Sequence, residues 1–208
     1  MDWVTATVLK VFVRPRRRRY KHRVMYPQLS IVPREFYPTM FAIGGSIIAR
    51  WRPSSLLHDV RIMGVEGLDS STLLMNAQRI LPFLLCDDIL LCYCGSNDFF
   101  DGRRVQDTMS RLISFFTNCH CHIVYINVIK SPVMRHMATP KVLDAFNLAI
   151  HTLLTGKRMT SFCISVDDDM QRADFVLDGI HLSESGYAKF EHQIAKKTEE
   201  IRRSSFIY

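Results

Sequence analysis

Four short blocks of the sequence supply the chemical groups that serine-based acyl transfer needs. In chain order they hold Ser46 in FAIGGSI, Gly67 in GVEGLDS, Asn97 in CYCGSNDFF, and Asp178 with His181 in DGIHLSESGY. A hydroxyl nucleophile, an imidazole base and a carboxylate that orients the base are the reacting groups of this chemistry. Backbone N–H groups and an amide side chain can stabilise the oxyanion that forms. The order of these blocks therefore predicts a serine nucleophile site.

The roles within this site follow from residue type and position. Ser46 is predicted to be the nucleophile, because Gly44 and Gly45 allow an unusual backbone and leave its hydroxyl uncovered at a strand-to-helix turn. The alternative is that Ser46 only caps the helix that follows. His181 would accept the serine proton, and Asp178, three residues earlier, would receive the other ring N–H of the imidazole.

The predicted oxyanion donors are the backbone N–H groups of Ser46 and Gly67 and the side-chain amide of Asn97. Two of them have structural alternatives, since Gly67 can be a plain turn glycine and Asn97 can form an Asx turn. Asp98 is expected to be structural and to hold the loop beside Asn97.

These blocks resemble the SGNH (GDSL-type) hydrolases, whose four letters are matched by Ser46, Gly67, Asn97 and His181. The resemblance runs over residues 41–201 and looks closest to small single-domain esterases, such as acetylhydrolases of platelet-activating-factor type. It implies a serine ester hydrolase that forms an acyl-serine intermediate without metal or cofactor. It also implies a flavodoxin-like sheet with strand order 2-1-3-4-5.

Three residues depart from the pattern of that family, and one of them is Ile62, which replaces an Asn often seen shortly before the Gly67 block. Gly45 stands where an Asp usually precedes the serine, and Glu66 stands beside the predicted oxyanion donor, where a small residue is common. A carboxylate directed into the site would oppose the developing negative charge and favour a cationic substrate. Glu66 is therefore a possible substrate-contacting residue. Arg135, in the stretch INVIKSPVMR that is similar to some microbial members, is another.

The apolar pattern predicts the elements that position these blocks. Apolar runs typical of strands cover residues 39–43, 60–63, 89–93, 122–128 and 161–166. Apolar stripes with helical spacing fall between and after them, near residues 73–81, 105–116, 142–153 and 187–201, and Ser70 or Ser71 can cap the first. Alternating strands and helices predict a three-layer α/β/α sandwich around a parallel five-stranded sheet. Sites in such sheets form at the carboxyl ends of the strands, where the blocks fall.

The positive charge of the chain is confined to its beginning. The 208 residues carry a net charge of +7, and residues 1–40 alone hold nine basic and two acidic residues, whereas the rest holds 18 of each. We expect a basic, partly disordered N-terminal arm over residues 1–35 and one hydrolase domain over residues 36–208. The arm could contact an anionic membrane or nucleic acid, or be only a solvated segment.

The remaining residue types bear on compartment and cofactors. None of the six cysteines has CxxC spacing, so they are interpreted as buried reduced thiols, which favours a reducing compartment. The run Asp167–Asp169 is interpreted as a solvated acidic turn, with no metal site. We expect an intracellular, cytoplasmic protein, with mitochondrial, nuclear or membrane-surface association as alternatives.

The sequence leaves several functions open. The expected substrate is a small-molecule, lipid or carbohydrate ester with a short acyl group, because no long apolar insertion offers room for a long chain. A carbohydrate O-acetyl esterase or an acyltransferase would use the same residues. A non-catalytic binding module that retains this fold is the alternative of a different class.

Overall fold

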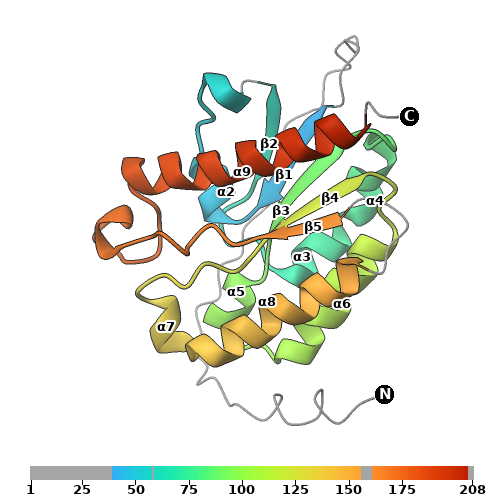
Figure 1. The fold of residues 1–208 in the computed structure, drawn as a ribbon. Helices are drawn as coiled ribbons and strands as arrows, with labels where there is room; N and C mark the ends of the chain where they lie inside the picture. The colour runs from blue at the N-terminus through green and yellow to red at the C-terminus, as the bar shows by residue number, and fades with distance from the viewer. Residues whose placement is uncertain (1–38, 58, 156–160, 206–208) are drawn as a thin grey trace.

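The sheet sets the architecture of the protein. The computed structural model describes residues 39–57, 59–155 and 161–205. Its strands are β1 (Met40–Gly44), β2 (Val60–Gly64), β3 (Ile89–Tyr93), β4 (His122–Ile126) and β5 (Ser161–Ile164). They form a parallel sheet in the order β2-β1-β3-β4-β5 (Figure 1), which confirms the predicted strand order. The predicted basic arm, residues 1–35, lies outside the described residues.

Helices cover both faces of this sheet. The α-helices are α2 (Ser46–Arg50), α3 (Ser70–Met75), α4 (Ala77–Ile80), α5 (Ser96–Phe100), α6 (Val105–Thr117), α7 (Met134–Met137), α8 (Pro140–Thr155) and α9 (Glu184–Ser205). Short 3₁₀ helices are η1 (Ser55–Leu57), η2 (Leu81–Phe83) and η3 (Arg172–Asp174). In Figure 1, α2 and α9 lie on one side of the sheet, and α3, α6 and α8 lie on the other. The predicted three-layer sandwich is therefore confirmed.

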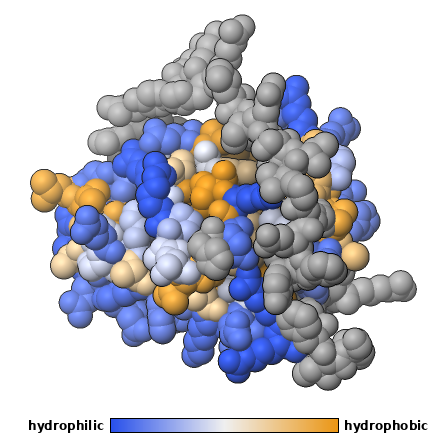
Figure 2. Space-filling model, turned by 90° about the horizontal axis from the view of Figure 1, so that it is seen from above, coloured by the Kyte–Doolittle hydropathy of each residue, from blue (hydrophilic) through white to orange (hydrophobic). Residues whose placement is uncertain are grey.

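Alternation along the strands divides the core into two clusters. Leu90 and Cys92 of β3 pack with α3, α6 and α8, whereas Ile89 and Leu91 pack with α2 and α9. Both sets are buried, because a strand with helices on both faces exposes neither side. Figure 2 shows the molecule from above Figure 1, with hydrophilic side chains surrounding smaller hydrophobic patches.

The first helical stripe differs from its prediction. The stripe near residues 73–81 is not one helix, because α3 ends at Met75, with Asn76 as its C-cap, and α4 and η2 follow as separate short helices. The predicted serine cap is also wrong: Asp69 is the N-cap, and its carboxylate accepts a 2.7 Å hydrogen bond from the Thr72 N–H. Ser70 instead bonds Asp98, as described below.

The cysteines are mostly buried, as interpreted from the sequence. Cys92, Cys94, Cys119 and Cys121 are buried as free thiols, but Cys86 is exposed. Burial raises the pKa values of Cys92 and Cys94 well above the ordinary value, and therefore keeps these thiols protonated.

Candidate active site

The turn between β1 and α2 presents Ser46. Gly44 lets β1 approach β3 closely, because a Cβ on Gly44 would lie 2.5 Å from the Tyr93 carbonyl oxygen. Ser46 follows Gly45 as the first residue of α2, so its N–H is one of the donors that a helix start leaves without an intrahelical partner. The side chain of Ser46 is partly exposed, whereas the following residues of α2, Ile47 and Ile48, are buried against the sheet.

A chain of hydrogen bonds joins Ser46, His181 and Asp178. The Nε2 atom of His181 lies 2.9 Å from the Ser46 Oγ, and its Nδ1 lies 2.5 Å from the Asp178 Oδ2. The other carboxylate oxygen, Oδ1, accepts bonds of 2.8 Å and 3.0 Å from the N–H groups of Ile180 and His181. This is the arrangement in which an imidazole can take a proton from serine while a carboxylate fixes its tautomer.

The hydrogen bonds also hold Asp178 in its charged form. Partial burial raises the pKa of this carboxyl, but the bonds from the His181 ring and from the N–H groups of His181 and Ile180 outweigh it and lower the pKa to about 2. Asp178 is therefore ionised at any pH above that value and can stabilise an imidazolium on His181.

The loop that carries Asp178 is fixed by backbone contacts. Gly179 has a φ of 67°, which favours glycine, and its N–H donates to the Val176 carbonyl at 2.9 Å. Its own carbonyl accepts a 3.1 Å bond from the Val133 N–H. A Cβ on Gly179 would lie 3.2 Å from the Val133 Cγ2, so the two segments pack closely.

Two of the predicted oxyanion donors, Gly67 and Asn97, come from the turn after β2 and from the first turn of α5. Gly67 has a φ of 75° in a turn closed by the 3.1 Å bond from the Leu68 N–H to the Val65 carbonyl. The Nδ2 of Asn97 donates to the Leu68 carbonyl at 2.7 Å. One amide N–H of Asn97 is thereby used, and its second N–H remains for another acceptor. Gly67 itself is exposed and does not line the pocket described below.

Asp98, in α5, holds the first residue of α3 and so has the structural role expected from the sequence. Its carboxylate accepts bonds of 2.9 Å from the Ser70 N–H and 2.6 Å from the Ser70 Oγ. It is buried, and burial raises its pKa although the Ser70 bonds oppose the shift. Arg103 lies 3.8 Å away and also bonds Asp69, which ties the start of α3 to the end of α5.

The structure gives a reason for a glycine at position 45. A Cβ at this position would lie only 2.9 Å from the Asn97 Nδ2. The amide of Asn97 therefore lies so close that a residue with a Cβ at position 45 would require this amide to shift. The departure at Gly45 and the close approach of Asn97 to the start of α2 are two aspects of one arrangement.

Glu66 and Arg135, predicted as possible substrate contacts, lie outside the Ser46 pocket. Glu66 is exposed, and its Oε1 accepts a 3.1 Å hydrogen bond from the Nε of Arg50. This arginine compensates the carboxylate charge, so the predicted repulsion of the oxyanion is weakened. Arg135 is exposed, and its Nε donates to the Lys130 carbonyl at 2.9 Å.

The pocket beside Ser46 is small and uses residues that sequence reasoning missed. It has a cavity volume of about 10 Å³, room for roughly one water molecule. Besides Ser46 and Asn97, its lining residues are Ile47, Tyr93, Ser96, Phe100, Ile129, Ser131, Met134 and Ile180. Most of these residues follow β3 and β4. Their position at the carboxyl ends of predicted strands is the one sequence signal that could have indicated them as pocket residues.

Neither a metal cluster nor a membrane span is found in the described part of the chain. No three His, Cys, Asp or Glu residues within it are arranged to hold a metal ion. Within the same ranges, no helix combines the length and the apolar character needed to cross a membrane. The interpretation of Asp167–Asp169 as solvated is wrong for Asp167, which is buried and accepts a 2.7 Å bond from the Lys130 N–H.

The fold of this chain is similar to the folds of several solved structures. A protein from Streptococcus pneumonia described as a platelet activating factor has a TM-score of 0.68 and 18% identity, over 82% of this chain and 86% of that one. A member of the lipolytic protein G-D-S-L family from Veillonella parvula has a TM-score of 0.63 and 14% identity, over 77% and 97%. The family 3 carbohydrate esterase of Clostridium thermocellum has a TM-score of 0.59 and 17% identity, over 81% and 98%.

Sequence comparison adds no closer relative. No protein-family model matches the chain, and no curated protein matches it. The similarity therefore lies in the three-dimensional arrangement, at identities that establish the fold alone.

Proposed function

We propose, from the SGNH hydrolase fold of this chain, that it is a metal-independent serine esterase that works through an acyl-Ser46 intermediate. The observation that carries the proposal is the hydrogen-bonded chain from Ser46 through His181 to Asp178. Ser46 and His181 lie 135 residues apart in the sequence, so the local chain does not impose their contact.

The proposed reaction begins with attack of the Ser46 Oγ on the ester carbonyl carbon. The Nε2 of His181 takes the serine proton, and Asp178 stabilises the imidazolium that results. The negative charge on the former carbonyl oxygen is stabilised by the N–H groups of Ser46 and Gly67 and by the free amide N–H of Asn97. His181 then returns the proton to the leaving alkoxide, and the acyl group stays on Ser46.

Water completes the proposed cycle. His181 takes a proton from a water molecule whose oxygen attacks the acyl carbon, and the serine leaves with that proton as the carboxylic acid forms. The small cavity volume of about 10 Å³ at Ser46 supports a short acyl group, such as acetyl. An acyl chain of several carbons would need the pocket walls to move.

Labelling with a fluorophosphonate probe tests this proposal. The probe reacts with activated serines, so we expect stoichiometric labelling of the protein, with the modified peptide containing Ser46 when it is identified by mass spectrometry. The variant His181→Ala should lose labelling, because its serine has no base. An unlabelled folded protein would favour the alternative that the fold serves as a non-catalytic binding module.

Gly45→Ala tests the oxyanion arrangement within this proposal. The Cβ of the variant would meet the Asn97 Nδ2 at 2.9 Å and displace the amide, while the φ of −74° at this residue suits alanine. We expect kcat for p-nitrophenyl acetate to fall about tenfold, less than the loss for removing a donor outright. The melting temperature should stay within a few degrees.

Asn97→Ala provides the control for this prediction. If Gly45→Ala acts through the amide, the double variant should be no slower than Asn97→Ala alone. If the fold-losses in kcat of the two single variants multiply in the double variant, Gly45 is not the residue that makes room for Asn97.

A further inference from the structure

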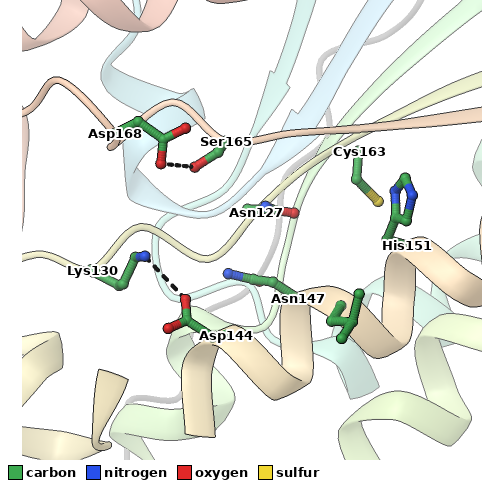
Figure 3. A pocket seen from close by; sticks show the side chains of 9 residues that line it. Asn127, Lys130, Asp144, Asn147, His151, Cys163, Ser165 and Asp168 are labelled. Atoms are coloured by element: carbon green, nitrogen blue, oxygen red, sulfur yellow. Dashed lines mark hydrogen bonds and ion pairs between the residues drawn. The ribbon is translucent and has the colours of Figure 1, made fainter. Parts of the chain in front are cut away.

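A second pocket lies at the other end of the sheet from β2 and is separate from the Ser46 pocket (Figure 3). Its walls come from the carboxyl ends of β4 and β5 and from one face of α8. The cavity volume is about 370 Å³, within the range of roughly 300–1,000 Å³ that is usual for small-molecule sites. The mechanism proposed above uses none of the side chains that line it.

Polar groups of both kinds converge on this pocket. The Nζ of Lys130 donates to the Asp144 Oδ1 at 3.0 Å, which leaves further N–H groups on the ammonium and a second oxygen on the carboxylate. Opposite them, the Ser165 Oγ lies 2.9 Å from the Asp168 Oδ1. Figure 3 shows these pairs on opposite sides of the opening, with the amide of Asn127 between them. The pocket therefore offers donors and acceptors within one small space.

Asn127 supplies the acceptor most in need of a partner. Its Oδ1 is buried and has no hydrogen-bond partner among the described residues. An amide oxygen in this position has lost its hydrogen bonds to water without gaining one from the protein, which is unfavourable. Asn147, in contrast, already has a partner at each polar atom, since its Oδ1 accepts from the Val128 N–H at 2.9 Å and its Nδ2 donates to the Val128 carbonyl at 3.3 Å. A ligand that donates a hydrogen bond would satisfy Asn127 without disturbing Asn147.

The charges around the pocket disfavour a charged ligand. An anion attracted by Lys130 would face the carboxylates of Asp144 and Asp168, and a cation attracted by those carboxylates would face Lys130. A ligand hydroxyl group is neutral and can both donate and accept hydrogen bonds, so it suits a pocket that holds an ammonium group beside carboxylates. Leu148, also in the lining and 64% exposed, adds an apolar surface that C–H groups can cover.

We propose that this pocket binds a neutral saccharide, with one hydroxyl donating to the Asn127 Oδ1 and others bonding Lys130, Asp144 and Asp168. The site adjoins the Ser46 pocket, because Ile129 and Ser131 line that pocket while Asn127 and Lys130 line this one. A single stretch of backbone thus forms a wall of both. Binding of the saccharide requires no reaction at Ser46, so the proposal stands independently of the esterase proposal.

Calorimetric titration of the Ser46→Ala protein tests the site without turnover. The probes are neutral tetrasaccharides of glucose, xylose and N-acetylglucosamine, with tetragalacturonate as an anionic counterpart and the glucosamine tetramer as a cationic one. We expect saturable binding of at least one neutral probe and weaker binding of both charged ones. The proposal would be overturned if none of the neutral probes binds saturably, or if a charged probe binds more tightly than the neutral ones.

Variants locate the binding. Asn127→Ala and Asp144→Ala should each weaken the neutral probe about tenfold, which corresponds to about 1.4 kcal/mol. Lys141→Ala is the matched control, because Lys141 is an exposed, charged residue of α8 that does not line the pocket, and it should leave the affinity unchanged. Asp144 is an exposed residue, so its variant tests the site even if Asn127→Ala lowers stability. Full affinity in both pocket variants would place the saccharide elsewhere and refute the assignment.

Discussion

Ser46→Ala should lower the turnover of p-nitrophenyl acetate by a factor on the order of 10⁴ or more. The hydroxyl that bonds His181 at 2.9 Å is the proposed nucleophile, and without it no acyl-enzyme can form. The fold should be unaffected, because the Ser46 side chain is partly exposed and alanine suits the first turn of α2. Initial rates and thermal unfolding of the same preparation measure both quantities.

Two further variants make this result specific. Ser114→Ala removes an exposed serine of α6 remote from the site and should keep full turnover. The double variant Ser46→Ala/His181→Ala should be little slower than Ser46→Ala, since residues that act as a unit show strongly non-additive losses. Wild-type turnover in Ser46→Ala would refute the nucleophile, whatever the structural similarity to esterases.

Asp178→Asn should lower kcat by roughly 10³–10⁴-fold while leaving the loop in place. The carboxylate now accepts the Nδ1 proton of His181, which leaves the Nε2 free to accept from Ser46. An Asn amide can instead donate to Nδ1 and thus favour the tautomer whose Nε2 carries the proton. That imidazole cannot act as a base toward the serine.

The pH dependence separates Asp178 from other groups. The pKa of Asp178 is lowered to about 2 from an ordinary value of 3.8, so this carboxylate is charged throughout the range of a normal assay. Any stability that it contributes is present above the ordinary value and is lost as the pH falls through about 2. Protonation of Asp178 should therefore not contribute to any fall in wild-type activity above the ordinary value of 3.8. Asp107→Asn removes a partly exposed carboxylate of α6, serves as the control and should leave the pH profile unchanged.

The sequence predicted those parts of the fold and site that short stretches determine. The blocks around Ser46, Asn97 and His181 could be found because each joins an apolar strand or helix to residues of defined chemistry. β3 was predicted at its observed bounds, since a continuous apolar run covers it. The break at Asn76 was missed, because the apolar stripe continues through it while the backbone does not.

Features that depend on contacts between distant segments could not be predicted. The direction of Glu66 is set by Arg50, on another element, and no local pattern indicates that pairing. The stretch around Arg135 was recognised, but Ser131 and Met134 are the residues of that stretch that line the Ser46 pocket. Their orientation follows from how the segment packs after β4, which a one-dimensional pattern does not contain.

The order in which the chain is made gives the contact between Ser46 and His181 a further meaning. Helix α9 docks beside α2 through the 2.9 Å bond from the Tyr187 hydroxyl to the Ile47 carbonyl and through the edge-on packing of Phe190 on Trp51. A nascent chain that already contains all five strands of the described sheet therefore still lacks the proposed base of Ser46, because His181 follows β5 in the sequence. In the proposed mechanism, Ser46 therefore gains its base only after the segment that carries His181 has been translated and has packed beside α2.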